Sequence, residues 1–378
     1  MGKHLVLAGG GHAHLTLLDR LTEITAEGHR VTVIGPSPYH YYSGMGPGML
    51  GGLYTPVQIR FATEQIVIRG GGTFLPDKVV RIDPERRRLF LAGGETMAYD
   101  LLSVNVGSFV PDTLRSGPGQ DIFSVKPIEN LLAARQRILR KLTADDTAVV
   151  TVAVVGGGPA AAEIAGNARD LAPAGDRSGL AVRLLAGDGL LKGFPEAVRR
   201  RVGRVLTRRG VTIEESGFVR KAETGRVIRA DGRDLAADII LLAPGIKPSP
   251  LFVDSGLPAG PDGGLRVNAC LQCPAYPEIF GGGDCVYFEP APLPKVGVYA
   301  VRQNPVLFDN LRSSLAGTEL KPFHPGGDYL LIFNLGGRVG VLHKGRLTIG
   351  GRLAFRLKDG IDRRFMARFQ IPESPATW

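Results

Sequence analysis

The chain has 378 residues, of which 44% are hydrophobic, with 52 glycines and 27 prolines. A chain of this length is too long to fold around one ordinary hydrophobic core. Its apolar content excludes a disordered or low-complexity protein. Lysine and arginine outnumber aspartate and glutamate by 46 to 36, and this net charge of +10 is compatible with nucleic acid, anionic lipid or simply a basic surface.

The first predicted element is a strand followed by a glycine turn, "LVLAGGGHAHL" at residues 5–15. Gly9 and Gly11 have the spacing of a dinucleotide-binding turn, in which glycine permits a tight bend and a helix N-terminus attracts pyrophosphate. His14 stands where the third glycine belongs, so we expect the helix to lie slightly away from its strand. The plainer interpretation of His14 is a packed, hydrogen-bonded histidine. The alternative is that His12 or His14 reaches the pyrophosphate or a proton path of the cofactor.

The second strand lacks the acidic residue that usually follows such a turn by about 20 residues and binds the ribose. In "VTVIGPSP" this position is Gly35, so the ribose would use backbone groups or Ser37.

A second copy of the pattern is "VTVAVVGGGPAAAEIAGNARDL", where Gly156, Gly158 and Ala161 follow a strand and open a helix. Two such turns are stronger evidence than one, because a tandem binder needs a site for each of two dinucleotides. At the end of the next strand, Ala186 and Gly187 stand where the acidic residue is expected, so the usual selection of NADH over NADPH is not encoded. An alternative is that this turn is a relic that binds no pyridine nucleotide.

Two further strands end in small and polar residues, "YDLLSVNVGSFVP" in Gly107–Ser108 and "YPEIFGGGDCVYFEP" in Gly283–Asp284. With the first turn, they resemble the set that brackets FAD in the pyridine nucleotide-disulfide oxidoreductase superfamily, and this resemblance covers nearly the whole chain. "GGGHAHL", "YYSGMGPGMLGG", "PLPKVGVYAVRQNPVLFDNL" and "RLKDGIDRRFM" are similar to type II NADH dehydrogenases and sulfide:quinone reductases. More narrowly, they resemble the flavoprotein module fused in front of selenophosphate synthetase.

The resemblance implies an α/β fold with two Rossmann-like domains and a small C-terminal α+β cap. The FAD-binding domain would comprise residues 1–120 and 238–320, with an NAD(P)-binding domain at 121–237 inserted, and 321–378 would form a hairpin and an amphipathic helix. The implied cofactor is FAD, with NAD(P)H as co-substrate. The implied reaction passes a hydride from NAD(P)H to the flavin and electrons onward to a quinone-type acceptor.

The resemblance also implies site residues, among which Asp284 would bind the ribityl chain of the flavin. The residues predicted to hold FAD are Gly9, Gly11, His12, Ala13, His14, Ser37, Ser43, Val80, Asn105, Gly107, Gly283, Asp284, Lys295 and Val296, and those predicted to hold NAD(P)H are Gly156, Gly158, Pro159 and Ala160. We predict no metal site.

Four residues, Glu163, Lys295, Tyr299 and Gln303, are predicted to take part in the chemistry. In relatives, the helix that follows Lys295 points its N-terminus at the flavin, so its dipole and the ammonium group would stabilise the anionic reduced flavin. Tyr299 and Gln303, one helical turn apart, would line a quinone pocket, although Tyr299 also fits an ordinary core aromatic. Glu163 resembles a glutamate near the nicotinamide and flavin, or else it is a surface helix residue. The loop 41–48 is expected to form the other wall.

The three cysteines are Cys270, Cys273 and Cys285. The spacing of "CLQC" is that of a redox dithiol, but in this superfamily the reactive cysteines lie elsewhere, so we interpret the pair as structural.

Three cysteines cannot form a secreted disulfide framework, and the N-terminus runs into a strand without a signal-peptide pattern, so we expect a cytoplasmic protein. The apolar runs are far shorter than the ~20 residues that span a bilayer.

The C-terminal region reads as a meander with its first turn at 334–337, followed by a basic amphipathic helix at 352–369 that Gly360 weakens. Its apolar residues recur every four positions: Leu353, Leu357, Ile361, Phe365 and Phe369. The helix would pack on the flavin domain, form a homodimer contact or lie on the cytoplasmic face of an anionic membrane, and we favour the membrane because quinones dissolve in lipid. No recognised motif supports nucleic acid as a partner.

Two other functions are compatible with the sequence. In the first, a sulfur or selenium compound would reduce the flavin, and the reactivity would depend on Cys270 or Cys273. Alternatively, the chain would be a flavin-bearing interaction module that docks on selenophosphate synthetase.

Overall fold

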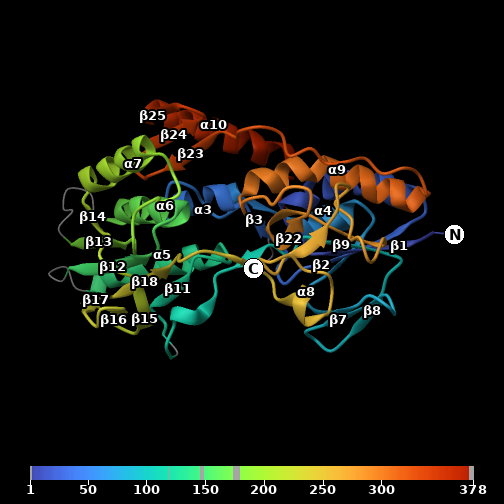
Figure 1. Cartoon of the computed structure of the whole chain (residues 1–378), viewed down its shortest axis with the longest axis horizontal. Helices are drawn as coiled ribbons and strands as arrows, with labels where there is room; N and C mark the ends of the chain where they lie inside the picture. The colour runs from blue at the N-terminus through green and yellow to red at the C-terminus, as the bar shows by residue number, and fades with distance from the viewer. Residues whose placement is uncertain (1, 118, 145–148, 173–178, 374–378) are drawn as a thin grey trace.

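The computed structural model describes residues 2–117, 119–144, 149–172 and 179–373. Two parallel five-stranded sheets dominate it, one with the order β21-β9-β1-β2-β5 and the other with the order β11-β18-β12-β13-β14 (Figure 1). The predicted α/β class with two Rossmann-like cores is therefore confirmed.

The first sheet gathers strands from both ends of the chain: β1 (His4–Ala8), β2 (Arg30–Ile34), β5 (Thr73–Leu75), β9 (Leu101–Val104) and β21 (Ile279–Gly281). Every residue of β1 is buried, which suits the continuous apolar run of a strand covered on both faces. Because β21 pairs in parallel with β9, the chain returns to this sheet after completing the second one. The carboxyl ends of β1, β9 and β21 consequently meet at one edge.

The second sheet is built from β11 (Ile122–Ser124), β12 (Val150–Val155), β13 (Leu180–Leu185), β14 (Val211–Glu214) and β18 (Ile239–Leu242), with α5 (Glu129–Ala144), α6 (Pro159–Ala168) and α7 (Glu196–Arg208) beside it. Each parallel sheet is accompanied by a three-stranded antiparallel sheet. These are β6 (Val79–Asp83), β7 (Arg88–Leu91) and β8 (Thr96–Ala98) in the first half, and β15 (Val219–Glu223), β16 (Arg226–Arg229) and β17 (Asp234–Ala236) in the second. The repeat seen in the glycine turns thus extends to whole domains.

The remaining elements of the first domain are short, apart from α9. They are α1 (Leu15–Asp19), α2 (Leu21–Ala26), α3 (Gly46–Leu50), α4 (Thr63–Arg69), α8 (Leu251–Asp254) and α9 (Gly297–Ala316), with strands β3 (His40–Tyr41), β4 (Arg60–Phe61), β10 (Ser108–Phe109), β19 (Lys247–Pro248), β20 (Leu265–Val267) and β22 (Val286–Phe288). Helix α9 ends at Gly317, which adopts a left-handed conformation with φ +71° that glycine accommodates without strain.

The C-terminal region forms the predicted meander and helix: β23 (Leu331–Asn334), β24 (Gly340–Lys344), β25 (Leu347–Gly351) and α10 (Arg352–Phe369). The first turn begins after Asn334 and is closed by the N–H of Leu335, which donates to the carbonyl of Val339. In Figure 1 these red elements lie across α6 and α7 and reach toward the first domain.

The apolar row of α10 does not face the core along its whole length. Leu353, Leu357 and Ile361 are 75%, 46% and 46% exposed, whereas Phe369 is buried. A step of four residues exceeds one helical turn by about 40°, so the row winds from the outer surface to the core. The surface of this helix therefore carries apolar side chains beside its arginines.

Candidate functional site

A cavity of about 650 Å³ lies at the carboxyl edge of the first sheet. Its walls include residues 9–12 after β1, Ser37 after β2, residues 105–108 after β9 and residues 283–284 at the end of β21. Ligands of open parallel sheets bind at this edge, and the volume is in the range of small-molecule and cofactor sites. The segments predicted to bracket FAD thus face one cavity.

The first glycine turn packs too closely for any side chain. A Cβ on Gly9 would lie 2.3 Å from the carbonyl oxygen of Asn105, and one on Gly11 would lie 2.4 Å from the Oδ1 of the same residue. The Nδ2 of Asn105 is buried without a hydrogen-bond partner among the described residues. A buried donor of this kind costs free energy unless a ligand satisfies it, so the turn and Asn105 fit a bound dinucleotide.

His14 is fully buried and does not line the cavity. Its Nδ1 donates to the carbonyl of Gly9 over 2.6 Å, and its Nε2 lies 2.8 Å from the hydroxyl oxygen of Ser103 on β9. Ala13 is buried as well. The geometry favours the plainer interpretation, in which the His14 ring ties the turn to the sheet where a third glycine would usually lie.

Replacing His14 with phenylalanine is expected to destabilise the FAD-free protein by about 1–3 kcal/mol near neutral pH, because Gly9 and Ser103 lose a buried partner. Burial lowers the pKa of His14 to about 4, whereas the unfolded chain has a value of about 6.5. The wild type therefore loses stability as the pH falls from 6.5 toward 4, by on the order of 2 kcal/mol at pH 5, and the variant lacks this loss. Urea unfolding at about pH 7.5 and pH 5 measures both proteins. A difference in stability that does not shrink in acid would contradict this role.

Ser37, Ser43 and Gly107 line the cavity as predicted, but Val80 does not. Successive residues of a strand point to opposite faces, and in β6 it is Val79 that is buried against the cavity. Val80 is 46% exposed, so the predicted position is corrected by one residue.

Asp284 lies on the cavity wall in a small polar network. Its Oδ2 accepts hydrogen bonds from the hydroxyl of Ser108 at 2.8 Å and from Nζ of Lys126 at 3.0 Å. Lys126 also lines the cavity, and sequence reasoning missed it. The available signal was a lysine two residues after the end of strand β11, at the carboxyl end of the second sheet.

Lys295 is turned away from the large cavity, contrary to expectation. It forms an ion pair with Asp262 at 2.8 Å and donates to the carbonyl of Val286. The predicted ammonium beside the flavin is therefore corrected, and Lys126 is the lysine that faces the cavity. Gly297, the first residue of α9, does line the large cavity, so the helix N-terminus points as predicted.

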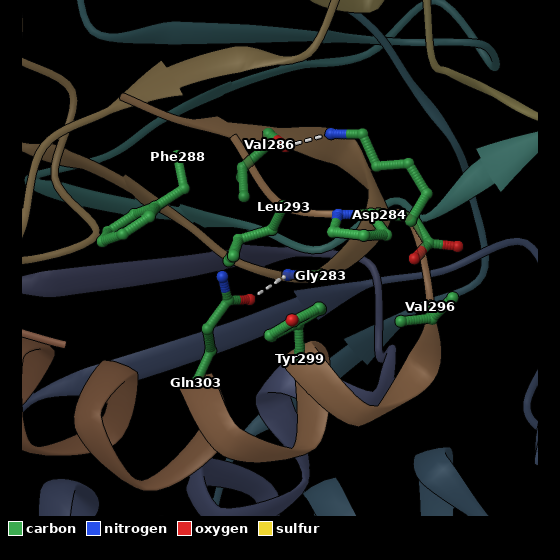
Figure 2. A pocket seen from close by; sticks show the side chains of 10 residues that line it. Gly283, Asp284, Val286, Phe288, Leu293, Val296, Tyr299 and Gln303 are labelled. Atoms are coloured by element: carbon green, nitrogen blue, oxygen red, sulfur yellow. Dashed lines mark hydrogen bonds between the residues drawn. The ribbon is translucent and has the colours of Figure 1, made fainter. Parts of the chain in front are cut away.

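Tyr299 and Gln303 do share one face of α9, next to Val296 and Leu293 (Figure 2). Gln303 is buried, and its Oε1 accepts the N–H of Gly283 over 2.7 Å, which holds the turn before Asp284. The space that these side chains enclose is about 10 Å³. This volume holds about one water molecule, so a quinone pocket does not exist there.

The second glycine turn keeps the geometry of a phosphate turn. Gly156 has φ +140°, and a Cβ there would lie 2.1 Å from the carbonyl oxygen of Ala243. Gly158 is the N-cap of α6 and Pro159 is its first residue, followed by the exposed Ala160. The residue after β13 is the buried Ala186, so the structure supplies no carboxylate at the usual ribose position.

Glu163 of α6 turns its carboxylate into the protein and is not a solvated helix residue. Its Oε1 accepts the N–H of Asn334, at the end of β23, over 2.6 Å. Burial raises the pKa of Glu163 to about 7, against the opposing charge of Lys358. The carboxyl group therefore exchanges a proton in the physiological range.

Lys358 and Asp362 of α10 and Tyr42, between β3 and α3, form a junction cluster with Glu163. Nζ of Lys358 donates to Asp362 at 2.6 Å and to the carbonyl of Gly44 at 2.9 Å, and the hydroxyl of Tyr42 donates to Asp362 at 3.1 Å. Tyr42 is flanked in sequence by residues that line the large cavity. Sequence reasoning missed these partners, although a lysine and an aspartate four residues apart share one helical face.

The cysteines are poor candidates for redox chemistry. Cys273 and Cys285 are buried, and none of the three lines the large cavity. Burial raises the pKa of all three thiols, that of Cys285 to about 11. They are therefore protonated near neutral pH and lack the thiolate that attacks disulfides.

Known proteins resemble this chain over most of its length. The family model of the pyridine nucleotide-disulphide oxidoreductases matches residues 3–304. Ferroptosis suppressor protein 1 of Taeniopygia guttata is 28% identical over 79% of this chain and 80% of its own length. A type II NADH:quinone oxidoreductase of Staphylococcus saprophyticus is 25% identical over 96% of this chain and 94% of its own.

Among solved structures, NDH2 from Plasmodium falciparum in complex with NADH superposes with a TM-score of 0.78. It covers 98% of this chain and 99% of that chain at 14% identity, which shows the shared fold. The predicted resemblance to the superfamily and to type II NADH dehydrogenases is confirmed, while the likeness to a module joined to selenophosphate synthetase stays a prediction. The chain belongs to the pyridine nucleotide-disulphide oxidoreductase family, as an FAD-dependent enzyme with NAD(P)H as its co-substrate.

Proposed function

We propose that the protein passes electrons from NAD(P)H through FAD to a quinone-type acceptor. The observation that carries this proposal is the junction cluster, which combines a titratable carboxyl group, a lysine and a tyrosine. The Tyr42 ring of this cluster lies 5.3 Å from the ring of His12, which lines the large cavity. The net reaction is NAD(P)H + H⁺ + quinone → NAD(P)⁺ + quinol. The relative from Staphylococcus saprophyticus, a type II NADH:quinone oxidoreductase that covers nearly the whole chain, supports the same reaction.

Bound FAD would supply the two-electron chemistry, and the chain supplies position and protons. The Gly9–Gly11 turn and Asn105 hold the dinucleotide, and Lys126 with Asp284 fixes the polar wall. A quinone takes up two protons when it is reduced to a quinol. Glu163, with a pKa of about 7, is suited to deliver one of them, while Lys358 keeps positive charge near the place where the acceptor gains electrons.

Steady-state assays with a panel of acceptors test this function. The FAD-loaded protein is given NADH or NADPH and then a soluble short-chain quinone, an aromatic disulfide or ferricyanide. In a separate assay without nucleotide, inorganic sulfide is the electron donor and the quinone is the acceptor. The proposal expects quinone turnover that greatly exceeds disulfide turnover, because all three thiols are protonated near neutral pH and two of them are buried. Disulfide reduction in the absence of quinone reduction would overturn it.

We also propose that α10 contacts the membrane surface, on the cytoplasmic face where the protein is expected. Among the described residues, no helix is long and apolar enough to cross a bilayer. The exposed row Leu353, Leu357 and Ile361 lies beside exposed arginines, a combination typical of helices that lie in an anionic interface. A lipid-soluble acceptor would then be delivered at the surface where α10 meets the junction cluster.

Replacing Leu353, Leu357 and Ile361 together by glutamine is expected to weaken binding to phosphatidylglycerol vesicles at least roughly tenfold, since three apolar side chains no longer enter the lipid. Vesicle sedimentation measures the affinity. The control is Val253→Gln, which changes an exposed apolar residue on α8. Unchanged vesicle binding of the triple variant would contradict the membrane contact. A dimer that dissociates in the triple variant would assign the apolar row to a contact with a second copy of the chain.

A further inference from the structure

Two histidines from separate segments meet at the wall of the large cavity. His12 follows Gly11 of the first turn, and His40 begins β3. The Nδ1 of His12 and the Nε2 of His40 are 3.2 Å apart, a hydrogen-bond distance, and both residues line the cavity. The proposed electron path gives this histidine pair no role.

Aromatic rings surround the pair. The ring of His12 lies 5.3 Å from that of Tyr42 and is stacked 6.4 Å from that of Phe365, and the ring of His40 is stacked 6.3 Å from that of Phe61. Burial lowers the pKa of His12 to about 4, and that of His40 well below its usual value, and Lys126 acts in the same direction. Both imidazoles are therefore neutral near pH 7, and each carries one N–H.

Counting these protons restricts the pair to two arrangements. If His40 donates its Nε2–H, the Nδ1 of His12 is the bare acceptor, and the His12 proton must be on Nε2. If His12 donates from Nδ1, its Nε2 is bare and can only accept. The partner on one side of His12 thus decides whether its other nitrogen is a donor or an acceptor.

The Nε2 of His12 is buried without a partner among the described residues. Leaving such a buried atom unpaired is unfavourable, so a ligand in the cavity is expected to satisfy it. FAD offers mainly acceptors, the phosphate oxygens and the carbonyl oxygens and ring nitrogens of the flavin. We propose that the Nε2–H of His12 donates a hydrogen bond to bound FAD, and that His40 is a positioning residue that fixes this tautomer by donating its own Nε2–H to Nδ1.

This inference rests on FAD binding and is independent of the proposed acceptor, so its test measures affinity and needs no turnover. FAD is removed, and its rebinding is followed by the quenching of its fluorescence. His12→Phe keeps an aromatic ring but has no donor, and it is expected to raise the Kd for FAD roughly tenfold. His12→Gln keeps an amide donor and is expected to recover most of the affinity.

Variants of the partner separate tautomer control from packing. His40→Phe leaves the His12 tautomer unfixed and is expected to raise the Kd by about threefold, whereas His40→Gln still donates an N–H to Nδ1 and is expected to bind like the wild type. The control is His324→Phe, at an exposed position. Unchanged affinity of folded His12→Phe, or equal losses for His12→Phe and His12→Gln, would overturn the proposal.

A measurement on the wild type keeps the test valid if a variant fails to fold. The ¹⁵N chemical shifts of the histidine side chains distinguish a protonated from a bare Nε2. The proposal expects a protonated Nε2 on His12 in the FAD-loaded protein, with an N–H signal that moves when FAD is removed. A bare Nε2 in the FAD-loaded protein would overturn it.

Discussion

Gly158→Val is expected to slow flavin reduction by limiting NADH or NADPH at least roughly 100-fold, a loss of ~3 kcal/mol, while FAD stays bound. Gly158 caps α6, and apart from its two chain neighbours no described residue has an atom within 4 Å of the position that its Cβ would take. The folded protein can therefore hold the larger side chain. The same space is where the pyrophosphate of a bound nucleotide would approach the helix N-terminus.

The measurement is the anaerobic rate of flavin bleaching after mixing with NADH or NADPH. Sodium dithionite, which needs no nucleotide site, should bleach the variant normally. The control is Gly203→Ala inside α7, where, outside the helix backbone, a methyl group meets the side chain of Leu190 at 3.8 Å and no closer atom of the described residues. A wild-type rate for Gly158→Val would identify the second turn as a structural relic and would place NAD(P)H elsewhere.

Glu163→Gln is expected to reduce kcat for quinone roughly 100-fold, the usual range for loss of a general acid. Glutamine retains the shape of the side chain and an acceptor for the N–H of Asn334, but it has no proton to give in the physiological range. Flavin reduction by NAD(P)H requires no such proton, so this half of the reaction should keep at least most of its rate.

The pH dependence distinguishes a proton donor from a structural residue. The pKa of Glu163 is raised to about 7, so the protonated, donating form declines as the pH rises above 7. Wild-type kcat for quinone should fall over this range, and the Glu163→Gln variant should lack the fall. The control is Glu196→Gln, an exposed residue of α7. Equal pH profiles in the wild type and the Glu163→Gln variant would refute the role as proton donor.

The fold was predictable because its signals are local. Gly9, Gly11, Gly156 and Gly158 mark sharp turns after apolar strands, and this combination requires little knowledge of distant contacts. The C-terminal helix was also predicted with the bounds that the structure has, because its residues recur with helical spacing.

The predictions that were wrong concern the direction in which a side chain points, and this direction depends on contacts with residues far away in the sequence. The sequence analysis predicts Lys295 beside the flavin, but the ammonium group of Lys295 forms an ion pair with Asp262, which lies 33 residues earlier. Lys126 faces the cavity because its ammonium group donates hydrogen bonds to Ser108 and Asp284 there. No periodicity in the sequence predicts these long-range contacts. Val80 fails for a smaller reason, since an error of one residue in a strand reverses the face.

The junction cluster illustrates the same limit. Lys358 and Asp362 belong to a helix that looks basic and amphipathic, and their burial against Tyr42 and Glu163 appears only when α10 is folded onto both domains. The sequence therefore locates the cofactor turns and Glu163, but it leaves Lys358, Asp362 and Tyr42, the partners of that carboxyl group, unidentified.

Two successive anaerobic additions test whether this flavoprotein transfers electrons from NAD(P)H to a quinone. NADH or NADPH is first added to the FAD-loaded protein, and a soluble quinone follows, while the yellow absorbance of the flavin is recorded. We expect rapid bleaching by at least one nucleotide and return of the yellow colour on addition of quinone. A flavin that neither nucleotide bleaches, or a bleached flavin that quinone does not reoxidise, would contradict it.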